Sequence, residues 1–313
     1  MTLAIEVRGL RKAYGRTAVL HGIDLDVPTG GIVGLLGPNG AGKTTTINCL
    51  TTLLAPDAGT ARVAGYDVRT QPARVRGSIA VTGQFAAVDI MLTGRENLVL
   101  FGRLLRLGRA QARRRADELL ARFDLADAAG KPVKAYSGGM RRRLDLAISM
   151  VVPRPVLFLD EPTTGLDPRS RGTTWEVVRE LRDAGTTVLL TTQYLEEADQ
   201  LADRLAVIDH GRVIAEGTAR ELKDRAGGAV CEIRLRSPEE LRRVVGKLGG
   251  RAHEVGTGGG NTVTVPAPDT RTLVEIAAML DAAGIEPEDL VRRRPTLDDV
   301  FLALTGQPET VPA

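Results

Sequence analysis

Cysteine, histidine, aromatic residues and long apolar runs are all scarce in this sequence, and the scarcity excludes several kinds of protein. The two cysteines, Cys49 and Cys231, do not have the spacing of metal ligands. Cys49 lies in an apolar segment that predicts a buried helix, where a thiol packs as a small hydrophobic group. A reducing cytosol is therefore the simplest setting.

Membrane-spanning and secretory signals are absent from the pattern as well. The sequence shows no apolar run approaching the roughly 18 residues that cross a bilayer. Its first ten residues alternate like a strand and lack the basic and apolar blocks of a signal peptide. If the protein acts at a membrane, another chain has to cross it.

Charge is present but balanced. The sequence has 42 Lys and Arg against 39 Asp and Glu, a net charge of +3, so bulk electrostatics give no case for a nucleic-acid partner. Arginine-rich runs at 113–115, 141–143 and 292–294 are more simply explained as solvated faces than as binding patches.

Alternating buried strands and helices dominate the first two thirds of the chain. Buried-strand patterns followed by helices recur at 31–36, 156–159 and 187–190. This alternation predicts a mostly parallel sheet with helices on both faces. Short alternating runs at 3–7 and 23–27 predict additional antiparallel strands, and apolar residues at helical spacing predict a helical subdomain over about 93–150.

A second, smaller domain is expected after a break near residue 225. We predict strands near 230–236, 251–255, 262–265 and 285–292, with helices over 239–248 and 271–283. This order is the ferredoxin-like β-α-β-β-α-β pattern, in which the glycine run 256–260 is a hairpin tip. The expected domains are therefore 1–225 and an α+β domain over 226–313.

One motif carries specific chemistry by itself. The pattern G-x-x-x-x-G-K-[ST] is complete at Gly37, Pro38, Asn39, Gly40, Ala41, Gly42, Lys43 and Thr44, with Thr45 after it. A predicted strand precedes this loop, and a helix predicted over 42–54 follows it. Glycines let backbone N–H groups surround phosphate oxygens, and the helix N-terminus adds its positive dipole end. Lys43 then reaches the β- and γ-phosphates, and the Thr44 hydroxyl binds magnesium, so the motif predicts Mg²⁺ and ATP as ligands.

Two carboxylates follow the buried strand at 156–159. Asp160 suits the magnesium shell, and Glu161 suits a base that polarises the attacking water. An apolar strand that ends in acidic residues is common, and by itself it is explained equally well as structural. The phosphate loop makes the catalytic interpretation the stronger one.

A second glycine-rich helix start follows at Ser137, Gly138 and Gly139. Free N–H groups there predict a second anion site, which one nucleotide does not need from the same chain. The segment from Tyr136 to Met140 resembles the LSGGQ signature of ATP-binding-cassette (ABC) ATPases, in which this helix caps ATP held by the opposite subunit. The resemblance covers about residues 3–225 and implies the P-loop NTPase ABC-ATPase fold, with an antiparallel β subdomain and a helical subdomain.

The resemblance also implies roles for single residues. Tyr14 falls where the family stacks an aromatic ring on adenine, although a turn-capping or core tyrosine is the open alternative. Gln84 falls at the Q-loop, where a glutamine reaches magnesium and senses the transmembrane partner. Asp167 belongs to the D-loop, which crosses the dimer interface.

Two departures from the family pattern stand out. Met140 and Tyr136 replace the usual glutamine and leucine of the signature. Gln193 stands at the position of the switch histidine, and it can hydrogen-bond a γ-phosphate but cannot carry an imidazolium charge. Hydrolysis is therefore expected to depend more on Glu161, and its rate stays open.

The departures themselves resemble the daunorubicin/doxorubicin resistance ATPases. The segments 136–147, 191–204 and 296–306 carry this resemblance, which reaches into the small C-terminal domain. It implies an ATP-hydrolysing subunit at the cytoplasmic face of the cell membrane that drives efflux of a hydrophobic drug-like compound, such as an anthracycline. The implied partners are a separate ABC-2-type permease and a second ATPase subunit, and a homodimer is expected. The C-terminal domain would support assembly, although simple packing of its tail helix explains the pattern equally well.

Two other classes of function are compatible with parts of this pattern. A soluble ABC ATPase acting on ribosomes or DNA usually has two cassettes or a long coiled coil, and this sequence has one cassette and no sustained heptads. A regulatory module that scarcely hydrolyses ATP is motivated by Gln193. The sequence does not name the transported compound, and it does not exclude a heterodimer.

Overall fold

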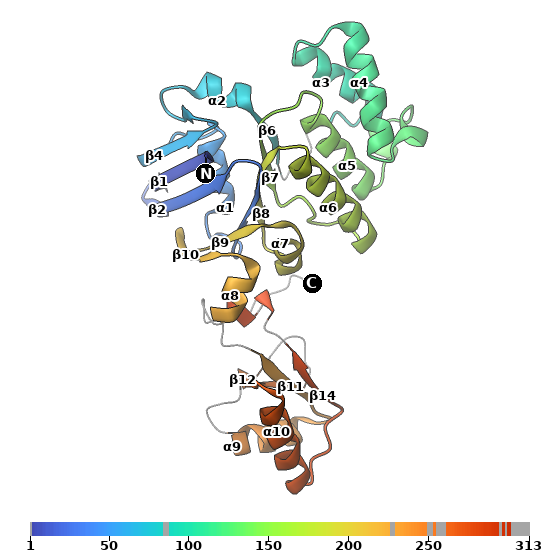
Figure 1. Cartoon of the computed structure of the whole chain (residues 1–313). Coiled ribbons are helices and arrows are strands. Elements are labelled where there is room, and N and C mark those ends of the chain that lie inside the picture. The colour runs from blue at the N-terminus through green and yellow to red at the C-terminus, as the bar shows by residue number, and fades with distance from the viewer. Residues whose placement is uncertain are drawn as a thin grey trace. The chain divides into compact units, whose positions relative to one another are not determined.

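The computed structural model describes residues 2–83, 88–225, 229–248, 253–254, 261–293, 296–297 and 299–301 (Figure 1). The chain forms two compact units, residues 1–216 and 217–313. The sequence-based boundary at 225 lies nine residues later, so the two divisions differ in where they place helix α8 (Ala219–Arg225).

A six-stranded sheet is the centre of the first unit, with strand order β10-β9-β3-β8-β7-β6. Its strands are β3 (Ile32–Leu36), β6 (Ile79–Thr82), β7 (Val156–Asp160), β8 (Thr187–Thr192), β9 (Arg204–Asp209) and β10 (Arg212–Gly217). The pairs β9-β3, β3-β8, β8-β7 and β7-β6 are all parallel, which confirms the predicted parallel sheet.

Side chains that alternate along these strands separate two hydrophobic cores. Val33, Leu35 and Phe158 pack in the core that contains the inner face of helix α1 (Lys43–Leu50). Ile32, Leu159 and Leu190 pack in the other core, with helices α5 (Gly138–Ser149) and α6 (Pro168–Asp183). Figure 1 shows α1 and α5 on different sides of this sheet.

The helix after the phosphate loop is shorter than predicted. It ends at Leu50 rather than near residue 54, and a turn follows. Thr52 has a φ of 65°, a left-handed conformation that interrupts a right-handed helix.

The predicted antiparallel strands form a separate four-stranded sheet with the order β2-β1-β4-β5. Its strands are β1 (Leu3–Tyr14), β2 (Thr17–Pro28), β4 (Ala58–Val63) and β5 (Tyr66–Asp67), and helix α2 (Pro72–Ser78) follows them. Strand β1 pairs antiparallel with both β2 and β4, so this sheet is the expected β subdomain.

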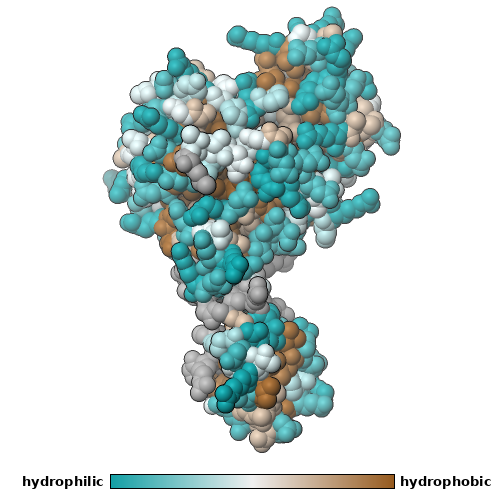
Figure 2. All heavy atoms as spheres, in the orientation of Figure 1, coloured by the Kyte–Doolittle hydropathy of each residue, from teal (hydrophilic) through white to brown (hydrophobic). Residues whose placement is uncertain are grey.

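The helical insertion contains α3 (Gly94–Leu104), α4 (Arg109–Arg122) and α5, with short 3₁₀ turns at Ala126–Ala128 and Val133–Ala135. Thr93 and Glu96 form a capping box at the start of α3, each side chain bonding the other's backbone N–H. Hydrophobic residues stand among hydrophilic ones on the surface of α3 and α4 in Figure 2, and Leu100, Leu104 and Leu105 are exposed there.

Strands β9 and β10 form the hairpin expected from the segment Asp209-His210-Gly211. The two residues between the strands, His210 and Gly211, both have positive φ, 43° and 69°. A two-residue type I′ turn requires this combination, because its twist matches that of the flanking strands.

The second unit has the predicted ferredoxin-like order. After α8, the described elements of this unit are β11 (Val230–Arg234), α9 (Pro238–Leu248), β12 (His253–Glu254), β13 (Thr262–Pro266), α10 (Thr270–Ala282) and β14 (Asp289–Arg293). The sheet order β12-β13-β11-β14 and its antiparallel pairs confirm the β-α-β-β-α-β interpretation. The glycine run 256–260 and the tail from 302 lie outside the described residues.

Candidate nucleotide-binding site

Three neighbouring strands bring the predicted chemistry to one edge of the parallel sheet. The phosphate loop follows β3, Gln193 follows β8, and Glu161 follows β7. Because β8 lies between β3 and β7, with Leu36 opposite Thr192 and Asp160 opposite Thr191, all three strands end at the same level. Ligands of open α/β sheets bind at this edge, outside the carboxyl ends of the strands.

The phosphate loop needs its glycines for steric reasons. A Cβ on Gly37 would collide with the backbone oxygen of Ile208, so the loop leaves β3 in direct contact with β9. Gly40 and Gly42 have φ of 82° and 107°, and a Cβ on Gly42 would lie 2.7 Å from Leu20 Cδ2. Only glycine adopts these conformations without strain, and Gly42 is also the N-cap of α1.

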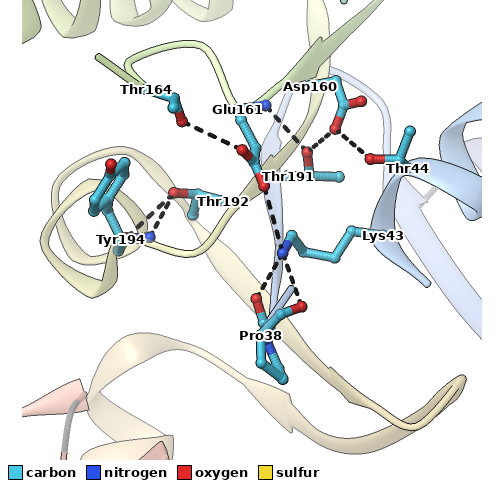
Figure 3. A network of polar contacts seen from close by, with 10 residues as sticks. Pro38, Lys43, Thr44, Asp160, Glu161, Thr164, Thr191, Thr192 and Tyr194 are labelled. Atoms are coloured by element: carbon cyan, nitrogen blue, oxygen red, sulfur yellow. Dashed lines mark hydrogen bonds and ion pairs between the residues drawn. The ribbon is translucent and has the colours of Figure 1, made fainter. Parts of the chain in front are cut away.

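Lys43 is held inside this loop. Its Nζ donates to the carbonyl oxygens of Gly37 and Pro38, at 2.7 and 3.1 Å (Figure 3). The same Nζ lies 3.6 Å from Glu161 Oε1, and both side chains are less than 10% exposed, at 5% and 8%. The ammonium group is thus already placed between the loop and the proposed base.

Asp160 lies among hydroxyl groups on the neighbouring elements. Its Oδ1 accepts hydrogen bonds from Thr191 Oγ1 at 2.5 Å and from Thr44 Oγ1 at 3.3 Å. An oxygen-only donor set of one carboxylate and one hydroxyl suits Mg²⁺, which takes its remaining ligands from water and phosphate. Among the described residues, no group of three or more His, Cys, Asp or Glu side chains lies together so that it could hold a metal ion.

The backbone of Glu161 is strained and firmly bonded. Its φ of 50° is left-handed, a conformation that non-glycine residues adopt only when their surroundings impose it. The N–H of Glu161 donates to both the backbone O and the Oγ1 of Thr191, at 3.1 and 3.2 Å. The carboxylate accepts a bond from Thr164 Oγ1 at 3.3 Å, as Figure 3 shows. This arrangement directs the carboxylate toward Lys43.

Thr191 and Thr192 are site residues that sequence reasoning missed. Thr191 bonds the proposed magnesium ligand Asp160 and the proposed base Glu161, and Thr192 Oγ1 accepts a bond from Tyr194 N at 2.9 Å. The Tyr194 ring also stacks on the guanidinium of Arg171, whose carbon lies 4.9 Å from the ring centroid. The available signal was a pair of hydroxyl residues ending an apolar strand, immediately before Gln193. Gln193 itself is half-buried at the end of this strand.

The signature-like segment begins α5. Ser137 is the N-cap and accepts a hydrogen bond from Met140 N at 3.2 Å, while Ser137 and Gly138 are exposed. A Cβ on Gly139 would lie 2.6 Å from Ser170 Oγ. Ser170 in turn bonds Asp167, the N-cap of α6, through its N–H and its hydroxyl. These bonds, the hydroxyl bond foremost, lower the pKa of Asp167.

Tyr136 replaces leucine for a structural reason. It is buried, and its hydroxyl donates to the carbonyl of Ala128 at 2.8 Å, closing the helical insertion on itself. Burial raises the pKa of this phenol. A Cβ on Gly94 would collide with the same hydroxyl, so this packing also requires a glycine at the start of α3.

Arg142, on the first turns of α5, is a further residue that the sequence did not single out. Its guanidinium donates to the backbone oxygens of Asp160, Glu161 and Pro162 and of Gly83. Nearby, Glu197 is fully buried and accepts a bond from Trp175 Nε1 at 3.3 Å. Burial lowers the pKa of Arg142 and raises that of Glu197, because each loses hydration of its charged form.

Two predicted site residues are not brought to this edge by the described contacts. Tyr14 ends β1 beside the β1–β2 turn and is 48% exposed, so its contact with adenine stays a prediction. Gln84 lies outside the described residues, and its role as a magnesium ligand stays a prediction.

The chain is similar in sequence to known ATP-binding proteins. A family model described as ABC transporter matches residues 20–164. The chain is 53% identical to the doxorubicin resistance ATP-binding protein DrrA of Mycobacterium tuberculosis (strain ATCC 25618 / H37Rv), over 98% of this chain and 95% of that protein. It is 54% identical to the daunorubicin/doxorubicin resistance ATP-binding protein DrrA of Streptomyces peucetius, over 98% of this chain and 94% of that protein.

A solved structure of the ATP-binding subunit of an ABC transporter is similar as well. The two share 30% identity with a TM-score of 0.65, over 72% of this chain and 94% of that one. Within the described residues, no helix combines the length and the apolar content that crossing a bilayer requires.

Proposed function

The chain belongs to the ABC transporter family of ATP-binding proteins, and from this premise we propose that it hydrolyses ATP to drive export of a hydrophobic drug-like compound. The observation that carries the proposal is the edge where Lys43 Nζ and Glu161 Oε1 lie 3.6 Å apart beneath a complete phosphate loop. The loop supplies N–H groups for phosphate, and the carboxylate supplies a base.

The residues divide the hydrolytic work between them. Lys43 exchanges its loop carbonyls for the β- and γ-phosphate oxygens, which stabilises charge that develops during transfer. Glu161 accepts a proton from water as the water oxygen bonds to the γ-phosphorus. The bond between that phosphorus and the β–γ bridging oxygen then breaks, and ADP and phosphate leave. Gln193, at the end of β8, donates a hydrogen bond to the γ-phosphate without adding charge.

Magnesium fits the oxygen donors that the structure brings together. Thr44 and Asp160 would hold it, with Gln84 as a third proposed ligand. The ion would neutralise phosphate charge. The hydrogen bonds from Thr44 and Thr191 fix the position of Asp160 Oδ1, so this ligand needs little rearrangement.

A second subunit completes the site in this proposal. Ser137 and Gly138 are exposed at the start of α5, which packs in the core opposite α1. One nucleotide on the phosphate loop therefore leaves the signature-like helix start available for a nucleotide held by a partner. We assign Ser137, Gly138, Gly139 and Asp167 to this composite site, in a homodimer.

Transport requires a membrane partner, which we propose to be an ABC-2-type permease. The ATPase would then act as a peripheral subunit at the cytoplasmic face of the cell membrane. The relatives' names include doxorubicin and daunorubicin resistance, so an anthracycline is the first compound to test. Efflux measured with the cognate permease and a panel of hydrophobic compounds would identify the substrate.

The enzymatic part is tested by phosphate release. Glu161→Gln preserves size and ATP contacts but removes the base, so turnover should fall ~10²–10⁴-fold while ATP binding persists. Glu196→Gln is the matched control, because Glu196 is exposed on helix α7 (Leu195–Leu201). Phosphate release by Glu161→Gln at the wild-type rate, with the permease present, would refute this assignment.

A further inference from the structure

We propose that Arg142 is a positioning residue that fixes the Glu161 turn and couples it to the signature-like helix α5. The inference rests on the proposed function, since it concerns the same catalytic carboxylate. It goes beyond that function by linking two parts of one subunit, the Glu161 turn and the signature-like start of α5. Each of these parts is proposed to serve a different composite site.

The guanidinium of Arg142 uses all three of its nitrogens. Nε donates to Pro162 O at 2.7 Å, one terminal nitrogen donates to Gly83 O at 2.7 Å, and the other donates to the oxygens of Asp160 and Glu161 at 3.2 and 3.1 Å. The side chain is only 10% exposed. A planar fork can bond several carbonyls at fixed angles, which a lysine ammonium on a flexible stem cannot reproduce.

These bonds act on the strained residue from the side opposite Thr191. Thr191 holds the N–H of Glu161, and Arg142 holds its carbonyl oxygen. A non-glycine residue at φ 50° relaxes unless both flanking peptides are fixed. Without the guanidinium, the Glu161 oxygen keeps only the long bond from Thr164 N, at 3.4 Å, and the buried carbonyl groups of Asp160 and Pro162 lose a charged donor.

Acidic groups keep this buried charge in place. Asp145 Oδ2, one turn along α5, lies 3.6 Å from the guanidinium. Glu197, Asp160 and Glu161 also interact favourably with it through their charges. The resulting cluster connects α5 with the segment that follows β7. Through Glu197 it also connects α5 with α7, the helix that follows Gln193 in the chain.

The coupling follows from the rigidity of α5. Ser137 and Gly139 at its start are proposed to contact the partner's nucleotide, and Arg142 lies about one turn further along the same helix. A displacement of α5 on dimer closure is therefore transmitted to the carbonyl groups of Asp160 and Glu161. In this way, occupancy of the partner's site adjusts the base of this subunit's own site.

The test compares Arg142→Gln and Arg142→Lys with wild type and with Arg122→Gln. Arg122 is a matched control, because it also joins the helical insertion to another element, pairing with Glu180 of α6 at 2.8 Å, but does so at an exposed site away from the nucleotide. Measured quantities are kcat and Hill coefficient for phosphate release, the Kd of a fluorescent ATP analogue, and Tm.

Arg142→Gln should lower kcat about 10²-fold, the loss expected when a reacting group moves by about 1 Å, with Kd changed less than about twofold. Its Hill coefficient should fall toward 1. Arg142→Lys should recover part of kcat, and Arg122→Gln should match wild type. The split between kcat and Kd distinguishes positioning from general loss of structure, which would lower Tm and weaken binding together.

Suppose that wild type shows Glu161-dependent hydrolysis and that Arg142→Gln has the kcat and Hill coefficient of wild type. This result would overturn the inference about Arg142 and leave the proposed function intact. Weaker ATP binding, a lower kcat and a lower Tm, all together in both Arg142 variants, would also overturn it, since Arg142 would then be structural. If wild type and Arg122→Gln released no phosphate in a Glu161-dependent manner, the proposed function would fail instead.

Discussion

The contact between Gly139 and Ser170 predicts how an added methyl group at the signature-like segment changes stability. In Gly139→Ala the new Cβ would lie 2.6 Å from Ser170 Oγ, whereas an ordinary contact needs at least 3.4 Å. The hydroxyl must therefore rotate away, and it loses its 2.6 Å bond to Asp167 Oδ2.

The magnitude follows from two opposing terms. Losing one hydrogen bond at an exposed site costs about 1 kcal/mol. Replacing glycine by alanine inside a helix contributes about 0.5–1 kcal/mol of stabilisation. Gly139→Ala alone should therefore change the free energy of unfolding by less than about 1 kcal/mol.

A double-mutant cycle separates the two terms. In a Ser170→Ala background the hydroxyl bond to Asp167 is already absent, so Gly139→Ala should keep its helical gain, reduced only by the 3.2 Å approach of the new Cβ to the Cβ of residue 170. We expect a coupling energy of about 1 kcal/mol, or a Tm difference of about 2–4 °C between the two backgrounds for a unit of this size. Equal Tm changes in both backgrounds, measured by differential scanning calorimetry, would refute the geometry of this contact.

Two further predictions concern buried polar groups. Tyr136→Phe removes the hydroxyl that donates to Ala128 O, so the free energy of unfolding measured by chemical denaturation should fall by about 1–2 kcal/mol. An unchanged denaturation midpoint would contradict this packing of the helical insertion. Burial raises the pKa of Glu197 above its ordinary value of 4.5, so the folded state binds this proton more tightly than the unfolded state. The contribution of Glu197 to the free energy of unfolding therefore falls as pH rises through and above 4.5. Glu197→Gln should therefore show a smaller loss of Tm between pH 5 and pH 8 than wild type, and an unchanged pH slope would contradict the buried carboxylate.

The sequence predicted those parts of the site that are written in consecutive residues. The phosphate loop could be located because Gly37, Gly42 and Lys43 have a fixed spacing between a strand and a helix. Asp160 and Glu161 were predicted to lie near this loop because carboxyl ends of parallel strands meet at one edge. The described geometry places these residues together, while their catalytic roles await the experiments above.

Contacts made through strand register and helix packing could not be predicted in the same way. Thr191 reaches Asp160 because β7 and β8 pair with these residues opposite each other, 31 positions apart in the chain. Arg142 stood within an arginine run that the charge pattern assigned to a solvated face, yet its side chain is only 10% exposed. Composition does not reveal that all three arginines of this run are partly covered, because that depends on the rotation of α5 against its neighbours.

The early end of α1 has a similar origin. Residues 51–54 contain no glycine or proline that would stop a helix, but Thr52 adopts a left-handed φ, and the N–H groups of Leu53 and Leu54 both bond the oxygen of Asn48. Such a termination without glycine or proline leaves little trace in the sequence.

The most direct test of the account is whether the phosphate loop of one subunit meets the signature-like segment of another. One subunit would carry Asn39→Cys and the other Ser137→Cys, both exposed positions, each combined with Glu161→Gln to retain ATP. The natural thiols of Cys49 and Cys231 should not interfere, because both are buried and burial raises the pKa of each to about 11. The account predicts an ATP-dependent disulfide-linked heterodimer under mild oxidation. A mixture that stays monomeric with saturating ATP, or that links equally without ATP, would contradict the composite site.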